Sequence, residues 1–211
     1  MSTEKSVSYE IKNSYSVLNE HTSQTKNIWL VFHGIGYLSR YFLKYFKHLD
    51  AKENYIIAPQ AQSKYYLNGE YRHVGASWLT RENLEEGIEN TLNYLDAVYE
   101  SESLSKVDNL NILGYSQGVS VAARFLARRK IQCSNLIMHS GKVPGELTSK
   151  DFEFLENTNF SFIYGTEDEY LSPEIINTEE QRLKEIFPKN LDILKFKGGH
   201  EVNTGMISKF A

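Results

Sequence analysis

The chain has 211 residues, of which 41% are hydrophobic and 13% aromatic. This composition supplies enough apolar side chains for the core of one domain and is not typical of intrinsic disorder. The formal net charge is −4, and without an excess of basic residues we expect no nucleic-acid partner. The single cysteine excludes an intramolecular disulfide. We expect one domain over residues 1–211, with residues 1–6 flexible.

The first residues, Met-Ser-Thr-Glu-Lys, lack the apolar core of a signal peptide. Ser2 stands where myristoylation requires a glycine. No uninterrupted apolar stretch approaches the roughly 18 residues that cross a bilayer. The sequence therefore predicts a cytoplasmic protein without a membrane span, and it leaves the oligomeric state open.

Short apolar runs rich in β-branched and aromatic residues alternate with longer amphipathic runs. Runs that stay apolar, rather than alternating in polarity, are typical of strands covered on both faces, so they predict a mostly parallel sheet. Residues 7–18 are predicted as an edge hairpin that turns at Asn13 and Ser14. The other predicted strands are 28–32, 55–58, 110–113, 136–139, 160–164 and 193–196.

The amphipathic runs place apolar residues at helical spacing and are predicted as helices on the faces of the sheet. Thr80 is a favourable N-cap residue and predicts that the second of these helices begins near residue 81. The predicted helices are 38–49, 81–99, 119–129 and 175–186, with shorter ones at 149–155 and 202–209.

A Gly-x-Ser-x-Gly pentapeptide, Gly114 to Gly118, lies directly between an apolar strand and a helix. This context is typical of a nucleophile elbow, a strained turn that exposes a serine hydroxyl above a sheet. The free N–H groups at the start of the following helix point toward the oxyanion that forms when Ser116 attacks a carbonyl. The sequence therefore predicts Ser116 as a nucleophile rather than an ordinary turn serine.

A serine nucleophile needs a base and an acid that orients the base. In folds with this elbow they follow the serine in the order acid, then histidine. His200 lies in a glycine-rich loop after the last predicted strand and is the histidine that fits this order. Asp168, just beyond the strand at 160–164, is the preferred acid, with Glu167 and Glu169 as nearby rivals.

The segment Phe32-His33-Gly34-Ile35-Gly36 ends the first core strand, where a second oxyanion donor is expected. We expect the main-chain N–H groups of Ile35 and Gln117 to form the oxyanion hole. His33 has no partner at metal-ligand spacing, so we predict that it braces this loop and that no metal is bound.

Together, the His-Gly loop, the elbow, the segment from Gly165 to Asp168 and Gly199-His200 resemble the phospholipase/carboxylesterase family of α/β-hydrolases, which includes acyl-protein thioesterases. The resemblance spans residues 27–205 and implies a serine hydrolase without a cofactor that cleaves carboxylic esters or thioesters. It implies an α/β-hydrolase fold with helices on both faces of the sheet. The catalytic and oxyanion roles carry over to Ser116, Asp168, His200, Ile35 and Gln117. The chain departs from many members at Tyr37, where they have an Asp, and at Val119, where they have a second Gly. These departures leave the chemistry intact and argue against a thioester substrate.

The connection from Pro59 to Leu79 is rich in aromatic residues and leaves a strand at the carboxyl edge of the sheet, where ligands bind. We predict that Tyr66, Leu67 and Trp78 contact the substrate; the alternative is that such side chains only pack the loop onto the body. The stretch from Ser140 to Asn159 is too short for a large cap domain. A small ester or thioester is therefore the expected partner.

Three alternative functions are open to a chain with these residues. An acyl-thioesterase or lysophospholipase would use the same triad, and a peptidase or lipase is disfavoured by the missing cap and lid helix. A binding module with this fold would not need the triad, because a fold does not dictate a function. The complete set of Ser116, Asp168 and His200 favours an enzyme, a serine hydrolase of small carboxylic esters.

Overall fold

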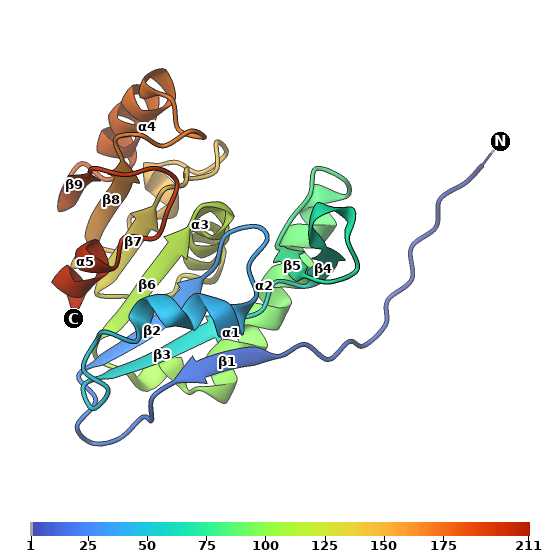
Figure 1. The fold of residues 1–211 in the computed structure, drawn as a ribbon, viewed down its shortest axis with the longest axis horizontal. Coiled ribbons are helices and arrows are strands. Elements are labelled where there is room, and N and C mark those ends of the chain that lie inside the picture. Colours follow the sequence, from blue (N-terminus) through green and yellow to red (C-terminus); the bar gives the residue numbers. More distant parts are fainter. Residues whose placement is uncertain (1) are drawn as a thin grey trace.

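The protein is represented by a computed structural model, which describes residues 2–211. Within these residues, seven strands form one sheet in the order β1-β3-β2-β6-β7-β8-β9 (Figure 1). β1 is antiparallel to β3 and the other neighbours are parallel, which confirms the predicted mostly parallel sheet. The strands are β1 (Tyr15–Leu18), β2 (Asn27–Phe32), β3 (Asn54–Pro59), β6 (Leu110–Tyr115), β7 (Asn135–His139), β8 (Asn159–Gly165) and β9 (Leu191–Phe196).

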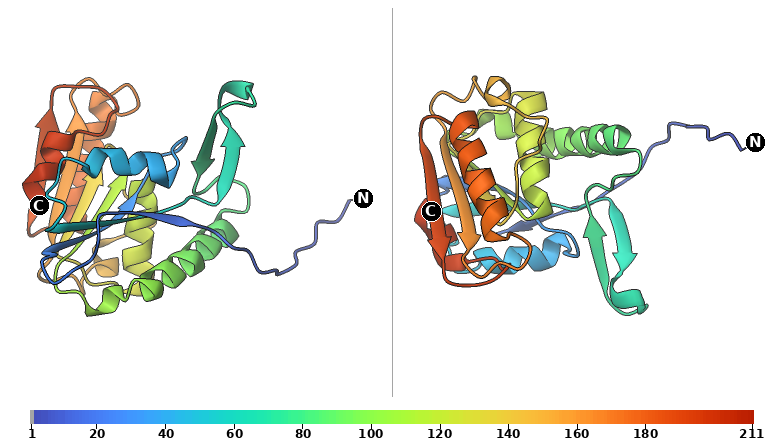
Figure 2. Two further views of the ribbon diagram at one scale, coloured as in Figure 1. Left: turned by 60° about the horizontal axis from the view of Figure 1, so that its bottom comes forward. Right: turned by 90° about the horizontal axis from the view of Figure 1, so that it is seen from above.

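Helices cover both faces of the sheet (Figure 2). Leu92, Phe125 and Leu183, from α2, α3 and α4, pack in one buried cluster on one face. Phe42 of α1 and Ile207 of α5 pack in a second cluster on the other face. The helices are α1 (Ser39–Phe42), α2 (Leu84–Ser101), α3 (Gln117–Arg129), α4 (Pro173–Ile186) and α5 (Thr204–Ile207), with 3-10 turns at Leu43–Phe46, Leu67–Gly69, Leu104–Lys106, Ser149–Asp151 and Ser208–Phe210.

The predicted edge hairpin over residues 7–18 is wrong. Only β1 forms, and residues 2–14 have no regular secondary structure and extend away from the body (Figure 1). Apolar and polar residues alternate in this segment, as in a strand with one buried face. However, Val7, Tyr9 and Ile11 are 84%, 78% and 66% exposed, so no part of the body covers their apolar side chains. Asn13 donates to the Gln60 carbonyl and marks where the ordered strand begins. Of the segment 1–6 expected to be flexible, Met1 lies outside the described residues.

Four predicted helices differ from the observed ones by more than two residues or in helix type, and one of them, expected over 202–209, is α5 followed by the 3-10 turn Ser208–Phe210. Thr80 is not an N-cap: its hydroxyl donates to the Glu82 carbonyl, and α2 begins at Leu84 after Asn83, whose φ is 47°. The helix expected over 38–49 is α1 followed by a 3-10 turn, and that expected over 149–155 is a single 3-10 turn. Local propensity did not distinguish α-helical from 3-10 turns of this length.

A second small sheet was not predicted from the sequence. β4 (Ser63–Tyr66) and β5 (Val74–Ser77) form an antiparallel hairpin that stands out from the body (Figure 2). β5 is held on the loop after β2, because the Gly36 N–H donates to the Ala76 carbonyl at 2.9 Å. A Cβ at Gly75 would lie 2.5 Å from the Gly36 oxygen, so the two backbones approach as closely as they do only without that side chain.

Two fully buried histidines brace loops at the carboxyl edge of the sheet. The His33 Nδ1 lies 2.8 Å from the Gly34 carbonyl oxygen. Because a carbonyl oxygen only accepts, Nδ1 carries the proton and donates, and Nε2 accepts from the Ala61 N–H. The His139 Nε2 accepts from the Asn203 N–H at 3.0 Å. Each ring is therefore a neutral imidazole, and each ties its strand end to a neighbouring loop.

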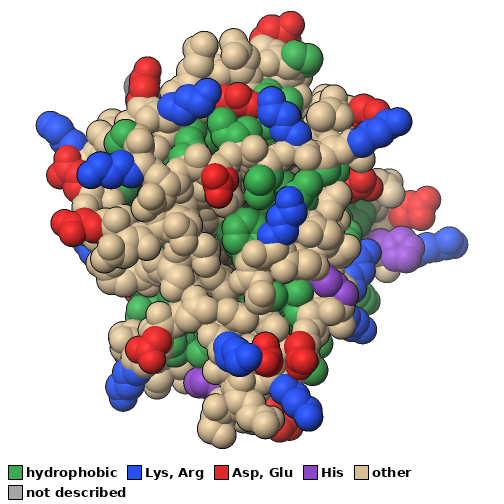
Figure 3. Space-filling model, turned by 90° about the vertical axis from the view of Figure 1, so that its left-hand side faces the viewer, with side chains coloured by type: hydrophobic (Ala, Val, Ile, Leu, Met, Phe, Trp, Pro, Cys, Tyr) green, Lys and Arg blue, Asp and Glu red, His purple; other side chains and the backbone are tan. Residues whose placement is uncertain are grey.

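The molecular surface mixes charges of both signs. On the face that includes β9 and α5, Lys, Arg, Asp and Glu side chains are interspersed (Figure 3). Within residues 2–211, no helix is both long and apolar enough to cross a membrane.

Replacing Gly75 by alanine should loosen the hairpin. The added methyl group would overlap the Gly36 backbone, and overpacking of this kind costs about 1–3 kcal/mol. Urea denaturation measures the resulting decrease in the free energy of unfolding. The matched control is Gly145→Ala, since a Cβ there meets nothing within 4 Å and should change the free energy of unfolding by less than about 0.5 kcal/mol. Equal effects in the two variants would contradict this packing.

Acidification should destabilise the protein through the two buried histidines. Burial lowers the pKa of His33 to about 4 and that of His139 to about 3, whereas a histidine in the unfolded chain has a pKa of about 6.5. The unfolded chain therefore binds more protons, and the free energy of unfolding falls as the pH drops from about 6.5 toward the folded values. We expect a loss of about 2 kcal/mol per histidine between pH 7 and pH 5.

Urea denaturation at both pH values tests this expectation. The variant His139→Gln removes one buried imidazole and should show the smaller pH dependence. The same pH dependence in the variant and the wild type would rule out His139 as a source of the effect.

Candidate active site

The turn between β6 and α3 has the geometry of a nucleophile elbow. Ser116 has φ 53° and ψ −118°, a strained conformation for a residue with a side chain. A Cβ at Gly118 would lie 2.1 Å from the Phe32 carbonyl oxygen, and one at Gly114 would lie 2.5 Å from the Gly118 oxygen. The two glycines of the pentapeptide thus allow the turn to pack against β2 with the serine at its apex.

The structure brings the three predicted triad residues together, although they come from three separate loops. The His200 Nε2 lies 2.9 Å from the Ser116 Oγ, and its Nδ1 lies 2.8 Å from the Asp168 Oδ2. A carboxylate only accepts, so Nδ1–H donates to Asp168, and in the neutral imidazole Nε2 is left to accept the serine proton. The Asp168 side chain is completely buried and that of His200 is 13% exposed.

The structure separates Asp168 from its two acidic neighbours. The second oxygen of Asp168, Oδ1, accepts from the main-chain N–H groups of Tyr170 and Leu171 at 2.9 and 3.0 Å. Glu169 contacts His200 only at the main chain, where its Oε2 accepts from the N–H at 3.1 Å. The side chain of Glu167 makes no hydrogen bond within residues 2–211. Only Asp168 is therefore placed to orient the imidazole ring.

Two tyrosines that sequence reasoning did not single out hold the His200 loop. The Tyr115 hydroxyl donates to the His200 carbonyl at 2.9 Å. Burial raises the pKa of Tyr115, so the hydroxyl keeps the proton that it donates. The Tyr170 ring, 68% exposed, meets the imidazole edge to face at 4.8 Å. Tyr115 is a variable position of the elbow pentapeptide, and nothing in the motif indicates a contact with a residue far along the chain.

The two predicted oxyanion donors lie on segments that meet near Ser116. Gln117 is the first residue of α3, so its N–H has no acceptor inside the helix. Ile35 belongs to the loop after β2 and its side chain is 54% exposed. A Cβ at Gly34, the residue before Ile35, would lie 3.2 Å from the Ser116 Cβ, so this loop passes beside the serine.

The predicted substrate-contacting residues do not gather in one place. Leu67 lies near the loop after β2, because a Cβ at Gly36 would be 3.7 Å from the Leu67 Cδ2. Tyr66 is 51% exposed and its ring packs on that of Tyr71 toward the end of the hairpin. Trp78 is only 3% exposed and its Nε1–H donates to the His33 carbonyl at 2.8 Å, so it packs beneath the loop.

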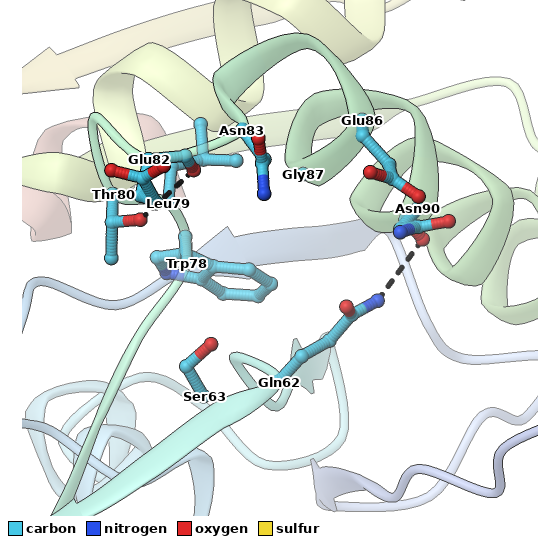
Figure 4. Close-up of a pocket in the computed structure, with 10 residues that line it drawn as sticks. All are labelled: Gln62, Ser63, Trp78, Leu79, Thr80, Glu82, Asn83, Glu86, Gly87 and Asn90. Carbon is cyan, nitrogen blue, oxygen red and sulfur yellow. Dashed lines mark hydrogen bonds between the residues drawn. The ribbon is translucent and has the colours of Figure 1, made fainter. Parts of the chain in front are cut away.

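A pocket of about 250 Å³ lies between the base of the hairpin and the start of α2 (Figure 4). Trp78 and Gln62 line it from one side and Asn83, Glu86 and Asn90 from the other, and Gln62 donates to the Asn90 carbonyl. None of the triad residues lines this pocket. Within residues 2–211, no group of three or more His, Cys, Asp or Glu side chains is arranged to hold a metal ion.

Comparisons with solved structures agree on the fold. Zea mays acyl-protein thioesterase 2 is 15% identical with a TM-score of 0.69, over 94% of this chain and 96% of that one. Esterase PE8 is 18% identical with a TM-score of 0.69, over 95% and 100%. A phospholipase/carboxylesterase from Dyadobacter fermentans is 14% identical with a TM-score of 0.64, over 96% of each chain.

These likenesses identify the α/β-hydrolase fold, and the part of the chain that the structure describes forms no large cap domain. No curated protein sequence matches the chain. The sequence model of the phospholipase/carboxylesterase family, however, matches residues 13–210. The resemblance inferred from the motifs is therefore confirmed over nearly the whole chain, and the protein belongs to the phospholipase/carboxylesterase family of hydrolases.

Proposed function

We propose that the protein is a serine hydrolase that cleaves carboxylic esters of small substrates through an acyl-enzyme. The observation that carries the proposal is the imidazole of His200, which lies within hydrogen-bond distance of both the Ser116 hydroxyl and the Asp168 carboxylate. A histidine placed in this way is both a general base for the serine and a general acid for the leaving group.

In the first half-reaction, the Ser116 Oγ attacks the ester carbonyl carbon while the His200 Nε2 takes the hydroxyl proton. The carbonyl oxygen becomes an oxyanion, which the N–H groups of Ile35 and Gln117 stabilise. The C–O bond to the alcohol then breaks, and the imidazolium returns its proton to the leaving oxygen. Asp168 accepts from Nδ1–H throughout and stabilises the imidazolium without taking the proton.

In the second half-reaction, water replaces the alcohol. His200 takes a proton from the water as it attacks the acyl carbon, and the same two N–H groups hold the second oxyanion. Collapse of this intermediate breaks the bond to the Ser116 Oγ, which recovers its proton from the imidazolium. The carboxylic acid leaves and the starting state of the site is restored.

The preference for small substrates is supported by what surrounds the serine. The connection between β7 and β8 holds only the 3-10 turn Ser149–Asp151, so it builds no cap over the site. Ile35, on the loop beside Ser116, and Tyr170, whose ring packs on His200, are exposed apolar side chains that a short acyl group could contact. Such an open site favours short acyl groups. Thioesters and lysophospholipids use the same chemistry and are distinguished by assay.

The serine is tested by a fluorophosphonate probe and a series of p-nitrophenyl esters. We expect mass spectrometry to find the adduct on Ser116 and turnover to be highest with short acyl chains. Ser116→Ala should prevent labelling and lower kcat by more than about 1,000-fold, because the covalent route is lost. Circular dichroism checks that the variant is folded.

Each alternative has its own signature. An optimum with long acyl chains or thioesters would favour a thioesterase or lysophospholipase, and an intact protein that is neither labelled nor active would favour a binding module. Substantial turnover by folded Ser116→Ala would contradict the mechanism.

The acid is tested by Asp168→Asn with Glu167→Gln as the matched control. The asparagine Nδ2 would donate to the imidazole Nδ1, so the imidazole takes the tautomer that carries its proton on Nε2. In that tautomer Nε2 cannot accept the proton of Ser116. By the precedent of other triads, kcat should fall by about 10,000-fold. Glu167→Gln removes the same charge one residue away and leaves both partners of the imidazole in place, so kcat should change by less than about 2-fold. Similar losses in both variants would refute the assignment of Asp168.

A further inference from the structure

The side chain of Gln117 bridges the start of α3 and the end of β5. Its Oε1 accepts from the Trp78 N–H at 2.9 Å, and its Nε2 donates to the Leu79 carbonyl at 2.8 Å. The Nε2 also donates to the Ser77 Oγ at 3.0 Å. The family motif explains the glycines and the serine of the elbow, but the proposed mechanism uses only the main chain of Gln117 and leaves this carboxamide unused.

These partners define which way the carboxamide points. The Trp78 N–H can only donate and the Leu79 carbonyl can only accept, so the oxygen must face Trp78 and the nitrogen must face Leu79. A carboxylate in the same place would turn an acceptor toward the Leu79 carbonyl. The bridge therefore requires an amide, and a glutamate of nearly equal size cannot replace it.

The same segment is attached to the other side of the site. Ala76, the residue before Ser77, accepts from the Gly36 N–H at 2.9 Å. Gly75 lies directly against the Gly36 backbone, and Tyr37 forms an antiparallel bridge with Ala76. β5 thus contacts the loop that holds Ile35 through its main chain, and it contacts the elbow through the Gln117 side chain.

We propose that the Gln117 carboxamide is a positioning group which, through β5, sets the separation between the N–H groups of Ile35 and Gln117. This inference rests on the proposed function, in which these two groups hold the oxyanion. The two N–H groups lie on loops that follow different strands, β2 and β6. β5 contacts both loops, through the main chain of Ala76 and the hydroxyl of Ser77. Oxyanion stabilisation depends on donors fixed before the reaction, so a small change in their spacing lowers the rate without weakening substrate binding.

The test compares Gln117→Glu with Asn54→Asp. Asn54 is a matched control because its carboxamide is also bonded at both ends: its Oδ1 accepts from the Trp29 Nε1–H and its Nδ2 donates to the Asp50 carbonyl. It lies at the amino end of β3, away from the elbow. We expect Gln117→Glu to lower kcat for p-nitrophenyl butyrate by at least about 10-fold, with KM changed by less than about 2-fold. Asn54→Asp should keep the wild-type kcat.

A second readout does not depend on activity. Amide hydrogen exchange at Gly36 reports on its bond to Ala76, and we expect faster exchange in Gln117→Glu but not in Asn54→Asp. Ser77→Ala, which removes one acceptor of the carboxamide, should change kcat and Gly36 exchange in the same direction by a smaller factor.

Wild-type kcat and wild-type Gly36 exchange in Gln117→Glu would overturn the inference, as would equal effects in Asn54→Asp. If the wild-type protein is neither active on esters nor labelled at Ser116, the proposed function fails on its own. Faster Gly36 exchange in Gln117→Glu would then support the bridge and overturn only its catalytic purpose, whereas unchanged exchange would overturn both.

Discussion

The close approach of the elbow to β2 is the constraint on which the candidate site depends. Because Gly118 has no side chain, its backbone lies against the Phe32 carbonyl, at a distance that a Cβ would reduce to 2.1 Å. This contact places the first turn of α3 beside the loop that follows β2. Ser116 and Ile35 each belong to one of the two segments in contact, so the contact brings the strained turn and the loop after β2 to the same place.

The site is assembled from loops rather than from regular elements, and buried polar contacts hold those loops. His33 secures the loop after β2, His139 secures the segment at Asn203, and Tyr115 secures His200. In each contact, a side chain buried at the edge of the sheet binds a main-chain group. Loss of one such contact would leave a buried polar group without a partner, which lowers the free energy of unfolding by about 1–3 kcal/mol.

The sequence predicted the parts of the fold that have a strong local signal. The apolar runs identified each strand of the main sheet, whereas the first half of the expected edge hairpin was predicted where no strand forms. The order of the motifs identified Ser116, Asp168 and His200 as the candidate triad. The β4–β5 hairpin was missed because all four residues of β4 are exposed, so no buried face gives it a period. The contact between Tyr115 and His200 was also missed, since it joins residues 85 positions apart.

The exposed hairpin has a consequence for how the protein loses its native structure. Few apolar side chains of β4 and β5 are buried, and segments of this kind open locally at a lower free energy than a central sheet. On heating or in denaturant, the hydrogen bond between Gly36 and Ala76 therefore breaks before the core unfolds. The loop after β2 then loses its outer support while the parallel strands are still intact, so the candidate site loses its order before the core of the sheet does.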